Sequence, residues 1–169
     1  MKNVYTWTAQ PAQRTVTIAG MQAEKGHRKW TQVTANTPDE AEAAGITGVD
    51  MMLCNIANVK TVRSGNDKLF LTAAMPFPDF ATKDDILRAS IGALGEGADA
   101  VMTARSMDVV EMLAREDIPV MGHLGLVPRK STWTDGLRAV GKTADEACHL
   151  FRQFKALEDA GGSREDTLI

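Results

Sequence analysis

The chain has 169 residues, of which 44% are hydrophobic and 24% charged, with a formal net charge of −3. This length predicts one domain with its own core, and the weakly acidic balance without a basic block argues against a nucleic-acid or anionic-membrane partner. No apolar run approaches the roughly 18 residues that span a bilayer, the start does not resemble a signal peptide, and the two cysteines form no metal or disulfide pattern, so we expect a cytoplasmic protein.

The N-terminal part is predicted to pass from a loose segment into regular structure. Residues 1–16, MKNVYTWTAQPAQRTV, predict a loosely ordered lead-in, and residues 17–26 a short helix. A second helix begins after Thr37, because Pro38 stands at the first helical position and Glu40 follows the cap at the spacing of a capping box.

From there, apolar segments with the length of strands alternate with helices. The run VDMMLCN at 49–55 is almost continuously apolar, as expected for a strand buried on both faces. The predicted strands are 29–35, 49–55, 68–77, 98–104 and 118–123. Residues 56–66 are predicted as either a short helix or a loop. The alternation predicts a parallel α/β sheet, and no glycine-rich phosphate loop supports a nucleotide-binding fold.

Three later helices follow cap signals at Thr82, Ser106 and Thr143. The inner stripe expected for the first of them consists of Ile86, Ala89, Ile91 and Leu94. The apolar face expected for the last consists of Ala147, Leu150, Phe151 and Phe154.

The segment IPVMGHLGLVP, followed by GLRAVGKTADEA and ALEDAG, resembles the ketopantoate hydroxymethyltransferase family of the phosphoenolpyruvate mutase-like superfamily. The segments TIAGMQAEKG, KWTQVTA, AGITGVDMML, TAAMPF and GEGADAVMTA resemble other parts of that family in the same order. The resemblance covers roughly residues 17–161.

The resemblance implies a TIM-type (β/α)8 barrel that assembles into homo-oligomers. Family members use Mg²⁺ to bind an α-keto acid and stabilise its enolate, which attacks a one-carbon unit from methylenetetrahydrofolate. Such a barrel takes about 250 residues, so we expect an incomplete barrel of about five β/α units over residues 17–161, with a flexible tail at 162–169. The family continues beyond the matched part into a strand that carries its general base.

The positions that match the family's magnesium ligands lack carboxylates. The aspartate after the second strand corresponds to Asn55, or to Cys54 in a register shifted by one residue, and the next aspartate corresponds to Ala74. The Lys-x-Glu pair after the fourth strand becomes Met102 and Ala104. Because Mg²⁺ needs anionic oxygen ligands, we expect no metal and no other cofactor.

Cationic residues follow the last two strands, at the end where barrel active sites lie. His123, a candidate catalytic residue, could contact a keto oxygen or a carboxylate, or it could be an inherited residue that stabilises a turn. Arg105, with Arg129 and Lys130, could form a metal-free pocket for a carboxylate; the alternative is a solvated loop arginine.

Neutral polar residues lie near the ends of the earlier strands. Asn55 and Thr72, with Thr34 and Asn36, could hydrogen-bond a small polar ligand, although each is also a common turn or cap residue. Cys54 is predicted to be a buried small apolar residue, since no sequence neighbour would activate its thiol.

These observations leave three interpretations open. The first is a divergent family member that binds or acts on a small α-keto acid and, if it is an enzyme, a transferase or lyase acting on a carbon–carbon bond. The second is an inactive relative that serves as a binding or assembly subunit. The third is a shortened sequence. In each case the open sheet and apolar helix faces predict a homo-oligomer.

Overall fold

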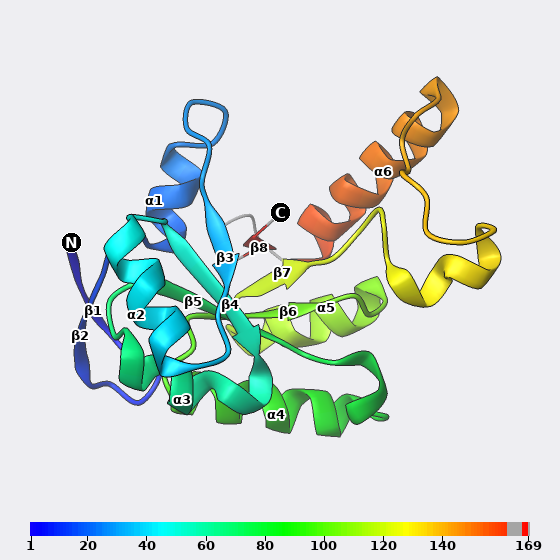
Figure 1. The fold of residues 1–169 in the computed structure, drawn as a ribbon. Coiled ribbons are helices and arrows are strands. Elements are labelled where there is room, and N and C mark those ends of the chain that lie inside the picture. Colours follow the sequence, from blue (N-terminus) through cyan, green and yellow to red (C-terminus); the bar gives the residue numbers. More distant parts are fainter. Residues whose placement is uncertain (162–166, 169) are drawn as a thin grey trace. The chain divides into compact units, whose positions relative to one another are not determined.

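The computed structural model describes residues 1–161 and 167–168, which form two compact units, Met1–Met102 and Thr103–Ile169. Each unit is built from strands and helices that alternate along the chain (Figure 1). In the described part of the chain, no helix is both long and apolar enough to cross a bilayer.

The first unit contains a parallel sheet with strand order β3-β4-β5-β6. Its strands are β3 (Gln32–Thr34), β4 (Met51–Asn55), β5 (Phe70–Ala74) and β6 (Ala100–Thr103), the last of which ends one residue inside the second unit. Its helices are α1 (Ile18–Ala23), α2 (Pro38–Thr47), α3 (Val59–Gly65) and α4 (Lys83–Gly95), with 3-10 turns η1 (Ile56–Asn58) and η2 (Phe77–Asp79). The predicted parallel α/β arrangement is confirmed, and residues 56–65 are helical.

Capping boxes are present at the start of two helices, α2, whose box was predicted, and α4, for which only a start signal at Thr82 was predicted. The Thr37 hydroxyl accepts from the Glu40 amide, and the Glu40 carboxylate accepts from the Thr37 amide at the start of α2. Thr82 and Asp85 form the same reciprocal pair at the start of α4. Short polar side chains at the caps therefore fix where these helices begin.

Alternate residues of the central strands form the core of the first unit. Met52 of β4, Leu71 of β5 and Val101 of β6 are completely buried, whereas Leu53 and Met102 are half-buried and lie on the opposite face. The helix α4 contributes a buried stripe made of Ile86, Ser90, Ala93 and Leu94.

The predicted place of Ile91 in that stripe is wrong, because its side chain is exposed. Ser90 takes the inward position, one helical turn after Ile86, and its hydroxyl donates to the Ile86 carbonyl at 2.8 Å. A polar residue is thus tolerated inside because its hydrogen bond is made within the helix.

Residues 1–16 form an ordered hairpin rather than the expected loose segment. Strand β1 (Lys2–Tyr5) pairs antiparallel with β2 (Pro11–Arg14), and the turn between them places Ala9 in the left-handed region, with φ 58°. Residues 1–16 lack an alternating apolar pattern, so their strands could not be predicted from periodicity. Its anchor is Arg14, whose side chain is buried.

Arg14, Arg63 and Asp99 form what we call the Asp99 cluster. Arg14 Nε donates to both carboxylate oxygens of Asp99, at 2.7 and 2.9 Å, and Arg63 Nη2 donates to Oδ2 at 2.6 Å. Burial lowers the pKa of Arg63, and the charge of Asp99 is the largest opposing influence.

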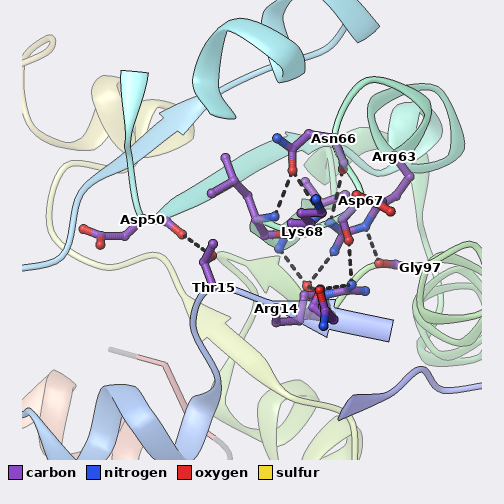
Figure 2. A network of polar contacts seen from close by, with 12 residues as sticks. Arg14, Thr15, Asp50, Arg63, Asn66, Asp67, Lys68 and Gly97 are labelled. Atoms are coloured by element: carbon purple, nitrogen blue, oxygen red, sulfur yellow. Dashed lines mark hydrogen bonds and ion pairs between the residues drawn. The ribbon is translucent and has the colours of Figure 1, made fainter. Parts of the chain in front are cut away.

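Backbone groups complete the Asp99 cluster. Arg14 also donates to the Asp67 carbonyl, and Arg63 donates to the carbonyls of Gly97 and Leu69 (Figure 2). These groups precede β5 and β6, so the hairpin is joined to the amino ends of the strands. These contacts all lie within the first unit.

The second unit contains α5 (Met107–Arg115), β7 (Val120–Gly122), the turn η3 (Pro128–Trp133) and α6 (Ala144–Ala160). Strand β7 pairs in parallel with β8 (Thr167–Leu168). These two residues belong to the predicted flexible tail, 162–169, the rest of which lies outside the described residues. Within the 17 residues of α6, only Leu157 is buried, and Phe151 of the expected apolar face is exposed.

Candidate functional site

The strand register of the first unit places side by side the positions that match the family's metal ligands on β4 and β5. Asn55 at the carboxyl end of β4 pairs with Ala74 of β5, and Ala74 pairs with Met102 of β6. Two residues earlier, Thr72 lies between Leu53 and Ala100 in the same way. Paired residues of parallel strands point to the same side, so Asn55 and Thr72 share one face of the sheet.

Asn55 belongs to a cluster of three asparagines at the carboxyl ends of β3 and β4. Asn36 Oδ1 accepts from the Asn55 amide at 2.8 Å and from Asn58 Nδ2 at 3.1 Å. Asn55 Oδ1 in turn accepts from the Ala57 amide at 3.0 Å. The side-chain oxygen Oδ1 of Asn55 thus caps the start of the turn η1. A ligand would therefore contact Asn55 through its side-chain Nδ2 group.

Asn58 was missed by the sequence analysis. It follows the strand by three residues and falls in the segment that could have been either a helix or a loop. The 3-10 turn η1 brings it back to Asn36, a contact between residues 22 positions apart. A polar residue in a tight turn after a strand was the only signal that could have found it.

Thr72 is completely buried, and its hydroxyl has no hydrogen-bond partner among the described residues. Buried hydroxyl groups are nearly always hydrogen-bonded, because leaving one unpaired costs about 1–3 kcal/mol. Thr72 therefore offers an unused donor and acceptor on the same face as Asn55.

The second unit brings together the predicted cationic residues. The His123 amide donates to the Thr103 carbonyl at 2.9 Å, and Thr103 Oγ1 accepts from the Arg105 amide at 3.2 Å. Arg129 Nη2 donates to the carbonyl of Ala104, which lies between Thr103 and Arg105 in the sequence. Thr103 and Ala104, at the end of β6, thus accept hydrogen bonds from both arginines and from the histidine.

The His123 ring contacts the Leu126 carbonyl through Nε2, at 3.1 Å. A carbonyl oxygen only accepts hydrogen bonds, so Nε2 must carry the proton. In the neutral ring Nδ1 is then the acceptor, and in the protonated ring it becomes a second donor. Because Nε2 is bonded to the Leu126 carbonyl, a ligand would contact the His123 ring through Nδ1.

The residues at the family's metal positions do not fit Mg²⁺. Asn55, Ala74 and Ala104 provide one neutral amide and two methyl groups, whereas this hard cation is held by carboxylate oxygens. The Ala104 carbonyl already accepts from Arg129. Across the described residues, His, Cys, Asp and Glu form no cluster of three that could hold a metal.

Cys54 is not suited to nucleophilic chemistry. Its side chain is buried, and burial raises the pKa of its thiol to about 11, against the opposing influence of the Arg63 charge. A thiol of this kind stays protonated near neutral pH. The predicted role as a buried small apolar residue agrees with this environment.

The parallel sheet, its flanking helices and the polar groups at the carboxyl ends of its strands define an α/β protein of the TIM-barrel type. The family model described as ketopantoate hydroxymethyltransferase matches residues 54–164, which is more than half of the chain. The chain belongs to the ketopantoate hydroxymethyltransferase family.

Curated relatives carry the name 3-methyl-2-oxobutanoate hydroxymethyltransferase. The protein from Pyrobaculum calidifontis is 32% identical over 88% of this chain and 65% of its own length. The protein from Ignicoccus hospitalis is 31% identical over 83% of this chain and 63% of its own length. The protein from Deinococcus radiodurans is 38% identical over 70% of this chain and 42% of its own length. The chain therefore spans less than two thirds of the length of these relatives.

Solved structures support the fold. A 2,3-dimethylmalate lyase of the PEP mutase/isocitrate lyase superfamily is 14% identical and superposes with a TM-score of 0.54, covering 86% of this chain and 62% of its own. A rubisco-like protein from Burkholderia fungorum is 12% identical and superposes with a TM-score of 0.53, covering 89% of this chain and 42% of its own. At these identities the likeness concerns the fold alone.

Proposed function

We propose that this chain is a divergent family member that binds a small α-keto acid without a divalent cation. The observation that carries the proposal is the end of β6, where Thr103 and Ala104 accept hydrogen bonds from the amides of Arg105 and His123 and from the side chain of Arg129. The parent reaction, hydroxymethyl transfer to 3-methyl-2-oxobutanoate, requires stabilisation of an enolate charge, and no residue at the metal positions provides it.

The second unit offers the contacts that a keto acid needs. Arg105 places a positive charge next to this strand end, and positive charge attracts a carboxylate. His123 Nδ1, when protonated, can donate to the keto oxygen while Nε2 stays on the Leu126 carbonyl. In the first unit, the candidate ligand contacts are Nδ2 of Asn55 and the hydroxyl of Thr72.

Thermal unfolding with 3-methyl-2-oxobutanoate and pyruvate tests this proposal. At a hundredfold excess over Kd, binding adds about 2.7 kcal/mol, which raises the Tm by roughly 5–10 °C for a chain of this size. We expect the same rise with Mg²⁺ and with EDTA, and its loss in His123→Ala.

His149→Ala, an exposed histidine on α6, is the matched control and should keep the full shift. A shift that appears only with Mg²⁺, or the absence of any shift with both acids, would contradict the proposal. A shift that survives in His123→Ala would remove His123 from the site.

A second candidate function, an assembly role, is favoured by the exposed apolar residues of the second unit. The fractional exposures are 82% for Trp133, 68% for Leu137 and 66% for Phe151. The loop that carries the first two packs on α6, because Leu150 lies beside Gly125 and Gly141. Apolar residues gathered on one helix and its loop are typical of a surface that another protein covers.

We propose that a second copy of the chain covers this surface. Light scattering after size exclusion should give a mass above that of the monomer, and Trp133→Glu with Phe151→Glu should reduce it to the monomer. Ile46→Glu, an equally exposed apolar residue on α2 of the first unit, should leave the assembly intact. A wild-type monomer at all concentrations would refute the proposal.

A further inference from the structure

The three asparagines that follow β3 and β4, which we call the asparagine cluster, have side-chain amides whose orientation the backbone fixes. A backbone N–H only donates, so the Asn36 atom that meets the Asn55 amide is Oδ1, and the Asn55 atom that meets the Ala57 amide is also Oδ1. Asn58 then donates its Nδ2 to Asn36 Oδ1. The side-chain groups left without a partner among the described residues are Nδ2 of Asn36, Nδ2 of Asn55 and Oδ1 of Asn58.

The groups around the asparagine cluster favour neither an anion nor a cation. The carboxylate of Glu40 accepts from the Asn36 amide at 2.6 Å, and its negative charge repels an anion. In the described part of the chain, no arginine, lysine or histidine contacts the three asparagines to offset that charge. A cation is disfavoured as well, because two of the three free groups are N–H donors. The cluster therefore suits an uncharged ligand that both accepts and donates hydrogen bonds.

The hydroxyl of Thr72 is the independent observation that points to a ligand. It is completely buried and has no partner among the described residues, whereas buried hydroxyls are nearly always bonded to protein or to water. Thr72 shares the sheet face of Asn55, and its neighbours on that face include Ala74 and Ala100, which carry only methyl groups. A small polar group on this face would give Thr72 the hydrogen bond that the chain itself does not supply.

We propose that the carboxyl ends of β3, β4 and β5 bind a small uncharged polyol. Its oxygens accept from Nδ2 of Asn36 and Asn55, one of its hydroxyls donates to Asn58 Oδ1, and its innermost hydroxyl bonds Thr72. Hydroxyl groups suit this set because each one donates and accepts at once. The inference goes beyond the proposed function and does not depend on it, since all of these side chains lie in the first unit and none of them carries a charge.

Titration of the full chain with D-ribose, followed by proton–nitrogen correlation NMR, tests the inference. We expect saturable shifts of the side-chain amide signals of Asn36 and Asn55, which Asn36→Ala and Asn55→Ala assign. Acetate at the same concentration, with ionic strength held constant, should leave these signals in place. Thr72→Val should weaken ribose binding by about fivefold, the ratio that corresponds to one net hydrogen bond.

Thermal unfolding without ribose gives a second readout for the same variant. Thr72→Val should not lower the Tm, because valine keeps the shape and removes a buried hydroxyl that has no partner. A hydroxyl with a purely structural role would be bonded within the protein, and its removal would lower the Tm. Thr61→Val, which changes an exposed threonine on α3, is the matched control and should leave ribose affinity unchanged.

The variant His123→Ala separates this inference from the proposed function. It should keep ribose binding, because His123 belongs to the second unit. Intact ribose binding in a chain that binds no keto acid would support the polyol site and refute only the proposed function. The absence of saturable shifts with ribose, shifts of the asparagine signals with acetate, or wild-type ribose affinity in Thr72→Val would overturn the inference.

Discussion

Asp99→Ala is expected to lower the free energy of unfolding by about 3–5 kcal/mol, the cost of removing one partner from a buried ion pair. The Asp99 carboxylate accepts from Arg14, from Arg63 and from the Leu71 amide, the last at 2.9 Å. The side chains of Arg14 and Arg63 are only 5% and 10% exposed, so the variant leaves two guanidinium charges in a poorly solvated place.

Urea unfolding followed by circular dichroism measures this effect, and Asp99→Asn, which keeps the shape, should lie between wild type and alanine. Glu111→Ala is the control, because Glu111 pairs with Arg115 on the exposed surface of α5. Exposed pairs of this spacing contribute about 0.5 kcal/mol or less. A loss below about 1 kcal/mol in Asp99→Ala would show that the Asp99 cluster does not hold the hairpin in place.

The double variant Asn55→Asp with Ala74→Asp is expected to bind a divalent cation far more tightly than the wild type. The two positions are direct partners on β4 and β5, so their carboxylates would lie one strand spacing apart, about 4.8 Å. An aspartate at 55 can still accept from the Ala57 amide, and Ala74 is half-buried, so both changes are compatible with the fold.

Manganese titration, read by electron paramagnetic resonance, should give a Kd of roughly 10⁻⁴ to 10⁻³ M for the double variant, the range of weak protein sites. Without metal, repulsion between the carboxylates should lower its Tm, and Mn²⁺ should restore it. Asn55→Asp alone is the control and should bind far more weakly. Equal binding by the wild type would contradict the assignment of a metal-free site.

Much of the fold could be predicted because its signals are local. Thr37 with Glu40 and Thr82 with Asp85 mark their helices within four residues, and the apolar run at 49–55 contains strand β4. The exposure of Phe151 could not be predicted in this way. Periodicity shows that a helix has an apolar face, but it does not show which other element covers that face.

The residues of the candidate site that lie at the ends of strands could be predicted, because the strands themselves could be recognised in the sequence. His123 and Arg105 were found because each follows a recognisable strand, and the structure joins them through Thr103. Asn58 was not found, since its contact depends on the path of a 3-10 turn. The unpaired hydroxyl of Thr72 depends on the packing of three strands, which no short stretch of sequence encodes.

The contact between Arg14 and Asp99 joins residues 85 positions apart, and this separation bears on the order of folding. During synthesis the hairpin is made well before its anchoring carboxylate, Asp99, which follows α4 in the sequence. Contacts of such long range are slow to form, because a large loop must close before they stabilise anything. We therefore expect β1 and β2 to dock late on the ribosome, which leaves this hairpin accessible to proteases and chaperones until Asp99 has been made.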